Sequence, residues 1–201
     1  MQLETVKYEK QGHIARITLN RPESLNACNL KMFDEMPKVW ADFKSDSDMR
    51  VAILTGAGNK AFCTGLDLKQ TASQGSEPEA LQMGNIRLSP RQNDVFKPVI
   101  CAINGIICGG GFHFYLGSDI IICSENATFF DTHTSIGFVA HREAIGLSRR
   151  IGYNHAMRFA LMGRYDRISA RRAYDIGLVT EVVPLENLLT RANEIAETLL
   201  K

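Results

Sequence analysis

The segment Val99–Asp119, VICAINGIICGGGFHFYLGSD, decides how this chain folds and where its chemistry lies. An apolar run typical of a buried strand enters three consecutive glycines, and Phe112-His113-Phe114 follows directly. A strand, a glycine loop and a helix in this order present backbone N–H groups and the positive end of a helix dipole. Such a place stabilises a phosphate or a developing oxyanion.

The spacing of the glycines excludes two kinds of nucleotide-binding loop. They are contiguous, so the dinucleotide motif G-x-G-x-x-G is absent, and no Gly-Lys-Ser/Thr follows for a P-loop. An oxyanion hole and tight strand–helix packing are the two interpretations that stay open. A second glycine turn, AFCTGLDLK at Ala61–Lys69, follows the apolar run Val51–Gly58 and favours the first. Two N–H groups from separate loops are what a carbonyl needs as it becomes an enolate.

Short apolar strands alternate with longer helical patterns along the chain. Strands are expected in His13–Asn20, Val51–Gly58 and Pro98–Gly105, twice within Asp119–Phe130, and in the segment LVTEVVP. Helices are expected in Leu30–Asp46, after the N-cap candidate Ser169, and in the amphipathic segment Leu185–Lys201. Pro37 indicates a helix start or a kink. The alternation predicts an α/β fold, in which ligands gather where strands lead into helices.

Composition excludes several classes of function. The chain has 201 residues, 45% hydrophobic and 22% charged, with a formal net charge of +1. Nucleic-acid binding by bulk electrostatics needs a basic face, which this balance does not supply. The five cysteines match no metal motif and no disulfide framework, and we interpret them as reduced thiols in a cytoplasmic protein. No signal peptide and no membrane span are expected.

Five segments together resemble the crotonase (enoyl-CoA hydratase/isomerase) superfamily, in the family's order and over nearly the whole chain. They are ITLNRPESLNA, VAILTGAGNKAFCTGLDLK, KPVICAINGIICGGG, SDIIICSENATF and RISARRAYDIGLVTEVVP. The resemblance implies a crotonase-like ββα spiral over residues 1–184 and the start of a C-terminal helical segment at 185–201, with the family's usual further helices absent from this sequence. It also implies a homo-trimer or hexamer, an acyl-CoA thioester substrate that contains coenzyme A, and neither a separate cofactor nor a metal.

The family's motifs carry functional residues over to this chain. The oxyanion-hole donors would be the N–H groups of Leu66, after the glycine of TGLD, and of Gly110, the middle glycine of GGG. Coenzyme A would lie along the turn at 21–27 and the loop at 61–69. The residues implied in its binding are Arg21, Ser24, Leu25, Ala27, Ala61, Phe62, Cys63, Asp67 and Leu68.

Both hydratase glutamates are replaced by histidines in this chain. His113 stands two positions after the glycine triplet, where the family has the first, and His133 stands twenty positions further on, where it has the second. An imidazole serves as acid or base near neutral pH, and two facing imidazoles predict that one stays neutral as the base. Asp131 or Glu143 would orient His133, and all four are candidate catalytic residues. Packing is the alternative for His113, and His141 is open between site and surface.

Three functions are compatible with these residues. The first is an acyl-CoA lyase or isomerase of the enoyl-CoA hydratase type, in fatty acid metabolism, with the two histidines as acid and base. The second is a hydrolase that cleaves a C–C bond in a β-diketone, because certain relatives of that activity resemble this chain in pairing a histidine with a carboxylate. The third is a non-catalytic binding protein with the crotonase fold. Retention of both glycine turns speaks against the third.

Overall fold

The computed structural model describes residues 1–68, 86–140 and 142–201. Its strands are β1 Val6–Gln11, β2 Ile14–Leu19, β3 Val51–Gly56, β4 Ala61–Cys63, β5 Val99–Ile103, β6 Ile106–Cys108, β7 Ile120–Ser124, β8 Thr128–Phe130, β9 Ile168–Ser169 and β10 Glu181–Val183. Its α-helices are α1 Leu30–Ser45, α3 Phe112–Gly117, α4 Arg142–Ile151, α5 Tyr153–Met162, α6 Ala170–Asp175 and α7 Leu188–Leu199. Short 3-10 turns are η1 Pro22–Ser24, η3 Arg91–Asn93, η4 Gly109–Gly111, η5 Thr134–Ile136, η6 Gly163–Tyr165 and η7 Leu185–Asn187.

The strands form two sheets between which the chain alternates. The larger has the order β1-β2-β3-β5-β7-β10, and the smaller has the order β4-β6-β8-β9. The pairs β3–β4, β5–β6 and β7–β8 each place the first strand in the larger sheet and the second in the smaller one. Neighbouring strands of successive pairs run parallel in both sheets. This repetition of strand pairs is the ββ part of the spiral that the sequence led us to expect.

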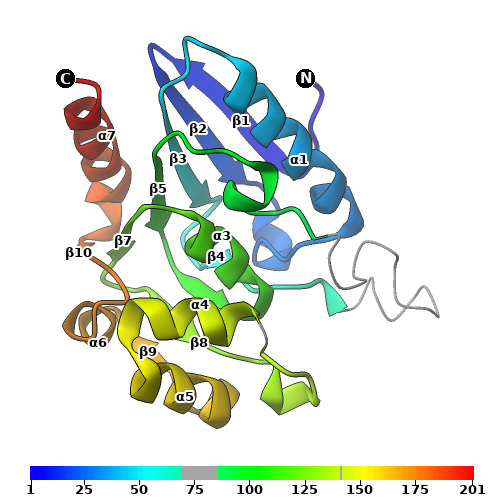
Figure 1. The fold of residues 1–201 in the computed structure, drawn as a ribbon, viewed down its shortest axis with the longest axis vertical. Helices are drawn as coiled ribbons and strands as arrows, with labels where there is room; N and C mark the ends of the chain where they lie inside the picture. The colour runs from blue at the N-terminus through cyan, green and yellow to red at the C-terminus, as the bar shows by residue number, and fades with distance from the viewer. Residues whose placement is uncertain (69–85, 141) are drawn as a thin grey trace.

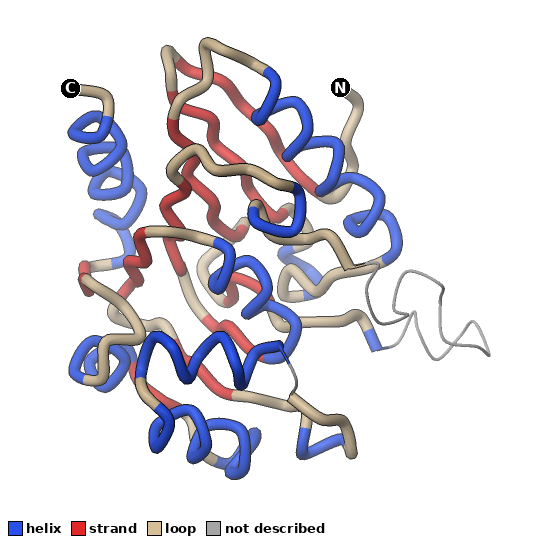
Figure 2. Tube along the Cα trace, viewed as in Figure 1, coloured by secondary structure: helices blue, strands red, loops and turns tan. Residues whose placement is uncertain are grey.

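Helices cover both faces of the larger sheet (Figures 1 and 2). On one face, α1 contributes Trp40 and Phe43 to the main hydrophobic core. On the other, α7 packs Leu188, Ala192 and Ala196 against apolar side chains of β3, β5 and β7. Every residue of β3 and β5 is buried. This double burial explains why both strands are continuous apolar runs rather than alternating ones.

The expected strands and helices are present, and the structure has four strands outside the expected ranges, β1, β4, β6 and β9. The strand β1 was missed because charged side chains alternate through VKYEKQ, and because only its pairing with β2 at the edge of the sheet identifies it. Pro37 neither starts nor ends a helix and lies inside α1. Met36, Val39, Trp40 and Phe43 are fully buried along that helix. Their packing offsets the backbone hydrogen bond that a proline cannot donate.

A glycine separates β5 from β6 because two backbone segments meet there. A Cβ on Gly105 would lie 2.6 Å from the carbonyl carbon of Lys60 and 2.8 Å from Ala61 N. Backbone atoms cannot rotate away as a side chain does. The crossing from the larger sheet to the smaller one therefore depends on the missing side chain at Gly105.

We predict that Gly105→Ala lowers the free energy of unfolding by about 2 kcal/mol or more, because the added methyl group overpacks a rigid backbone contact. Gly12→Ala is the matched control, since a Cβ there meets nothing within 4 Å and only its φ of +57° is unfavourable. The control should cost about 1 kcal/mol. Urea denaturation followed by circular dichroism measures both, and equal losses in the two variants would contradict the steric explanation.

Candidate active site

The two glycine turns lie against each other in the structure. A Cβ on Gly65, whose φ is +87°, would lie 2.9 Å from Gly110 N, and a Cβ on Gly110 would lie 3.7 Å from Leu66 N. Leu66 is held in a parallel bridge with Cys28. Cys28 N donates to Gly65 O at 2.7 Å, and Cys28 O accepts from the N–H of Asp67 at 2.9 Å. The backbone segments of Leu66 and Gly110 are thus adjacent, as an oxyanion hole requires.

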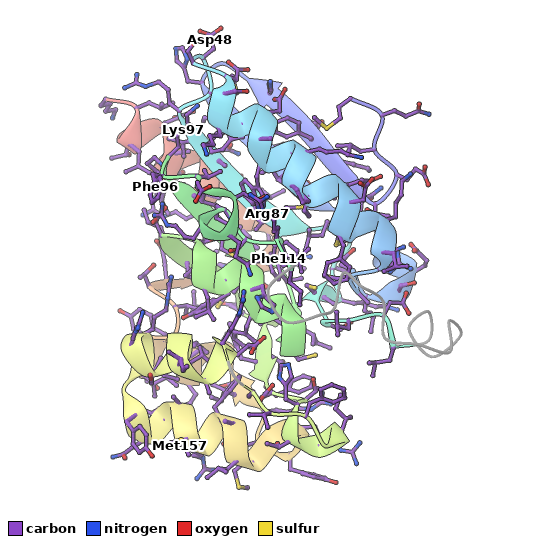
Figure 3. The ribbon with its side chains drawn as sticks, turned by 45° about the vertical axis from the view of Figure 1, so that its right-hand side comes forward. Asp48, Arg87, Phe96, Lys97, Phe114 and Met157 are labelled. Atoms are coloured by element: carbon purple, nitrogen blue, oxygen red, sulfur yellow. The ribbon has the colours of Figure 1, made fainter. Side chains whose placement is uncertain are left out.

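His113 occupies the first turn of α3 between two anchored rings. Phe112 and Phe114 are both fully buried. Phe112 packs edge-on against Phe159 with ring centroids 5.3 Å apart, and Phe114 packs against Phe62 at 6.2 Å. Phe114 lies near the centre of the molecule in Figure 3. Because both neighbouring rings are fixed in the core, the direction of the His113 side chain is restricted. The His113 side chain is only 11% exposed.

His133 is held by the buried carboxylate of Asp131. Oδ1 of Asp131 lies 2.6 Å from His133 Nδ1 and also accepts from the backbone N–H groups of Thr132 and His133, at 2.8 and 3.3 Å. Its second oxygen, Oδ2, has no hydrogen-bond partner within the described part of the chain. The following turn is anchored because Thr134 Oγ1 donates to Ala160 O at 2.9 Å. The structure thus brings Asp131, one of the two residues expected to orient His133, into contact with its ring.

Glu143, in the first turn of α4, lies between the two histidines. Its Oε1 is 3.1 Å from His113 Nε2 and 3.9 Å from His133 Nε2. The carboxylate is nearly buried, and the positive end of the α4 dipole favours its charge. Glu143 was expected beside His133, and the structure places it closer to His113. Four titratable side chains from three separate segments thus converge at one place.

The electrostatics of the cluster favour a charged His133 and a charged Glu143. Hydrogen bonding to Asp131 raises the pKa of His133 more than burial lowers it, and the charges of Asp131 and Glu143 add to the rise. Burial alone would raise the pKa of Glu143. The hydrogen bond from His113 and the charges of both imidazoles outweigh burial, so the pKa of Glu143 lies below its ordinary value. Each shift stabilises the ionised form of its group.

The two segments expected along coenzyme A are joined to each other. Arg21 Nη2 pairs with Asp67 Oδ2 at 2.9 Å, and Arg21 Nη1 donates to Ala27 O at 2.6 Å. Leu25 and Leu68 are exposed next to this pair. The strand β4 consists of Ala61, Phe62 and Cys63, and their side chains are buried. A ligand would therefore meet only the backbone of these residues. Ser24 lies half-buried in η1.

The remaining expectations concern residues outside the cluster, the cysteines, metal sites and membrane spans. His141 and Lys69 lie outside the described residues, and Arg142 is exposed at the start of α4. All five cysteines are free and buried. Within residues 1–68, 86–140 and 142–201, no group of His, Cys, Asp or Glu side chains has the geometry to hold a metal ion. No helix in these ranges has the length and apolar character needed to cross a membrane.

Comparison with known proteins gives one consistent family. The family model described as Enoyl-CoA hydratase/isomerase matches residues 9–201. The chain is 36% identical to (E)-benzylidenesuccinyl-CoA hydratase of Thauera aromatica, over 96% of this chain and 75% of that protein. It is 37% identical to carnitinyl-CoA dehydratase of Proteus mirabilis, over 93% and 71% of the two chains.

Solved structures show the same relationship in three dimensions. An enoyl-CoA hydratase/isomerase from Mycobacterium paratuberculosis superposes with a TM-score of 0.87 at 41% identity, over 98% of this chain and 75% of that one. Enoyl-CoA hydratase from Bacillus anthracis gives a TM-score of 0.88 at 34% identity, over 97% and 76%. The predicted crotonase-like α/β fold is thereby confirmed.

We predict that Asp131→Asn lowers the pKa of His133, because the variant loses the carboxylate that stabilises the imidazolium. A pKa raised by folding contributes stability below the unfolded-state value of about 6.5 and loses it as the pH rises through the folded-state value. The variant should therefore lose more free energy of unfolding at pH 6 than at pH 9. NMR titration of His133 and urea denaturation at both pH values measure this.

Asp166→Asn is the matched control for that experiment. Asp166 pairs with Arg158, whose guanidinium does not titrate in this range, so its loss should be the same at both pH values. A pH-independent loss in Asp131→Asn as well would contradict the assignment of His133 as the titrating partner.

Proposed function

The chain belongs to the enoyl-CoA hydratase/isomerase family, and from that premise we propose that it adds water to, or removes water from, the acyl group of a coenzyme A thioester. In this proposal His113 and His133 replace the usual pair of catalytic glutamates, with Asp131 and Glu143 as their carboxylate partners. Leu66 N–H and Gly110 N–H stabilise the thioester oxygen as it takes negative charge. The enzyme is then a lyase that needs no cofactor beyond the coenzyme A of its substrate.

The chemistry of the proposal balances in protons and electrons. In hydration, one imidazole removes a proton from water while the water oxygen bonds to the β-carbon of the enoyl group. The π electrons move to the thioester oxygen and give an enolate, which two N–H donors stabilise. The second imidazole, as an imidazolium, then gives a proton to the α-carbon. Dehydration runs through the same steps in reverse.

One observation carries this proposal: two imidazoles face a single carboxylate oxygen, at 3.1 and 3.9 Å. Acid–base chemistry on neighbouring carbons needs one proton donor and one acceptor close together, which this cluster supplies. The relatives named above are a hydratase and a dehydratase, the two directions of one reaction. The Arg21–Asp67 pair, with Leu25 and Leu68 exposed beside it, supports the proposed coenzyme A contact. A homo-trimer or hexamer is proposed from the family alone.

A second candidate is hydrolysis of a C–C bond in a β-diketone. The contact that favours it is the 2.6 Å pair of His133 with Asp131, because a histidine–carboxylate dyad activates water strongly. The leaving group of that reaction is also an enolate, which an imidazolium stabilises. A non-catalytic binding role is less well supported, since a scaffold gains nothing from four nearly buried titratable groups at one place.

We predict that His113→Ala and His133→Ala each lower kcat by about 10²-fold or more, because general acid–base catalysis contributes at least that much. His13→Ala is the matched control: His13 is exposed, with its Nδ1 2.8 Å from Asp48 O, and it lies outside the cluster. Steady-state kinetics on the substrate identified below measures all three. Wild-type kcat in both site variants would show that His113 and His133 have only a packing role.

The substrate assay that tests the proposal compares crotonyl-CoA, carnitinyl-CoA, a β-ketoacyl-CoA and a cyclic β-diketone. Hydration of an enoyl thioester, or dehydration of a hydroxyacyl thioester, supports the first candidate. Turnover of the cyclic β-diketone alone would replace it with the second. Release of free coenzyme A reports thioester hydrolysis, and formation of a new carboxylic acid without it reports C–C cleavage. Loss of enoyl absorbance without either reports addition of water.

We further predict that Gly65→Ala lowers kcat by about 10²–10³-fold, the usual effect of losing one oxyanion-hole donor. The new Cβ would displace Gly110 N, from which it would lie 2.9 Å. Gly137→Ala is the control, because it has a similar positive φ but no atom within 4 Å of the added group. Equal kcat in the two variants would argue against a catalytic role for the Leu66–Gly110 pair.

A further inference from the structure

We infer that Glu143 is the positioning residue of His113, and that the packing of Gly146 against Leu116 is what brings the two together. This inference rests on the proposed acid–base function and assigns a separate role, base or acid, to each imidazole. Glu143 acts on Nε2 of His113, whereas Asp131 acts on Nδ1 of His133. The two histidines therefore use unlike ring nitrogens.

The first step of the argument is the tautomer that each carboxylate selects. A carboxylate only accepts, so the 3.1 Å contact with Glu143 Oε1 requires the proton of neutral His113 on Nε2 and leaves the lone pair on Nδ1. The 2.6 Å contact with Asp131 requires a proton on Nδ1 of His133. Nε2 of His133, 3.9 Å from Glu143 Oε1, is then the nitrogen left for proton transfer, and none of the described residues pairs with Nδ1 of His113.

The second step is the number of carboxylates around each ring. His133 has one at each nitrogen, Asp131 at 2.6 Å and Glu143 at 3.9 Å, and this arrangement favours its cation. His113 has Glu143 alone. His113 is therefore the base in the hydration direction. Its Nδ1 accepts a proton from water while the water oxygen bonds to the β-carbon. The imidazolium of His133 gives its Nε2 proton to the α-carbon of the enolate, and both rings return to their starting states by exchange with solvent.

The third step is how Glu143 reaches His113. Helices α3 and α4 pack together, and His113 and Leu116 lie three residues apart on α3, as Glu143 and Gly146 do on α4. Residues at this spacing share one helix face. A Cβ on Gly146 would lie 2.7 Å from both methyl carbons of Leu116, which packs against the main core, so a side chain there would displace Leu116 or α4. Arg150 completes the contact by donating to Leu116 O and Ser118 O, at 3.1 and 2.6 Å.

The test measures kcat and KM of four variants on the substrate that the wild-type enzyme turns over. Glu143→Gln keeps the shape of the side chain and removes its charge. Because Glu143 acts through His113, we expect kcat to fall by about 10-fold or more while KM stays within about twofold. The same variant should lower the pKa of His133 in an NMR titration, because the charge of Glu143 helps to raise it.

Gly146→Ala tests the positioning without touching a titratable group. It should lower kcat because Leu116 or α4 has to shift, and Gly146→Ala with Leu116→Ala should recover most of the loss because the space is restored. Leu116→Ala alone is the reference for the double variant, because the two share the shortened side chain at position 116. Circular dichroism and thermal unfolding give the folded fraction of each variant, so that kcat is calculated per folded enzyme.

Unchanged kcat in Glu143→Gln would overturn the inference, and so would a loss in Gly146→Ala that the double variant does not recover. These outcomes are separate from failure of the proposed function. If His113→Ala is inactive while Glu143→Gln is fully active, only the positioning role fails. If both His113→Ala and His133→Ala retain wild-type kcat, the acid–base function itself fails.

Discussion

Close approach of backbone to backbone at the glycine turns is the constraint on which the structure of the site depends. Gly65 meets Gly110, Gly111 meets the carbonyl of Cys63, and Gly105 meets Lys60, all at distances that leave no space for a Cβ. These contacts join β4 and its following turn to β6 and the glycine triplet. Since α3 begins directly after the triplet, its first turn and His113 are placed by the same contacts.

The charge arrangement follows from that placement. Two imidazoles and two carboxylates are nearly buried together, and a buried charge without a partner destabilises a fold by several kcal/mol. Each histidine here has a carboxylate within 4 Å, and each carboxylate has a histidine. The pKa shifts of His133 and Glu143 run in opposite directions, as expected for groups that stabilise each other's charge. The cluster thus holds acid and base forms side by side, which is the requirement for moving protons in both directions.

Much of the fold and part of the site were predictable from local patterns. The buried runs of β3 and β5, the N-cap Ser169 and the amphipathic α7 each follow from periodicity or capping within one segment. Edge strand β1 was not predictable in this way, since its pattern VKYEKQ is dominated by charged residues and only pairing with β2 defines it. Pro37 shows the same limit, because tertiary packing of α1 overrides a local helix breaker.

The sequence by itself determined the family, the two glycine turns and the positions of His113 and His133, because each is encoded in a contiguous motif. It also identified Asp131, two residues from His133, as a partner. Only the tertiary structure decided that Glu143 lies closer to His113 than to His133, at 3.1 against 3.9 Å. That choice depends on how α4 packs on α3 through Gly146 and Leu116, a contact between residues thirty positions apart. Spacing along a chain states which residues share a helix face, but the angle at which two helices meet is set by the side chains between them.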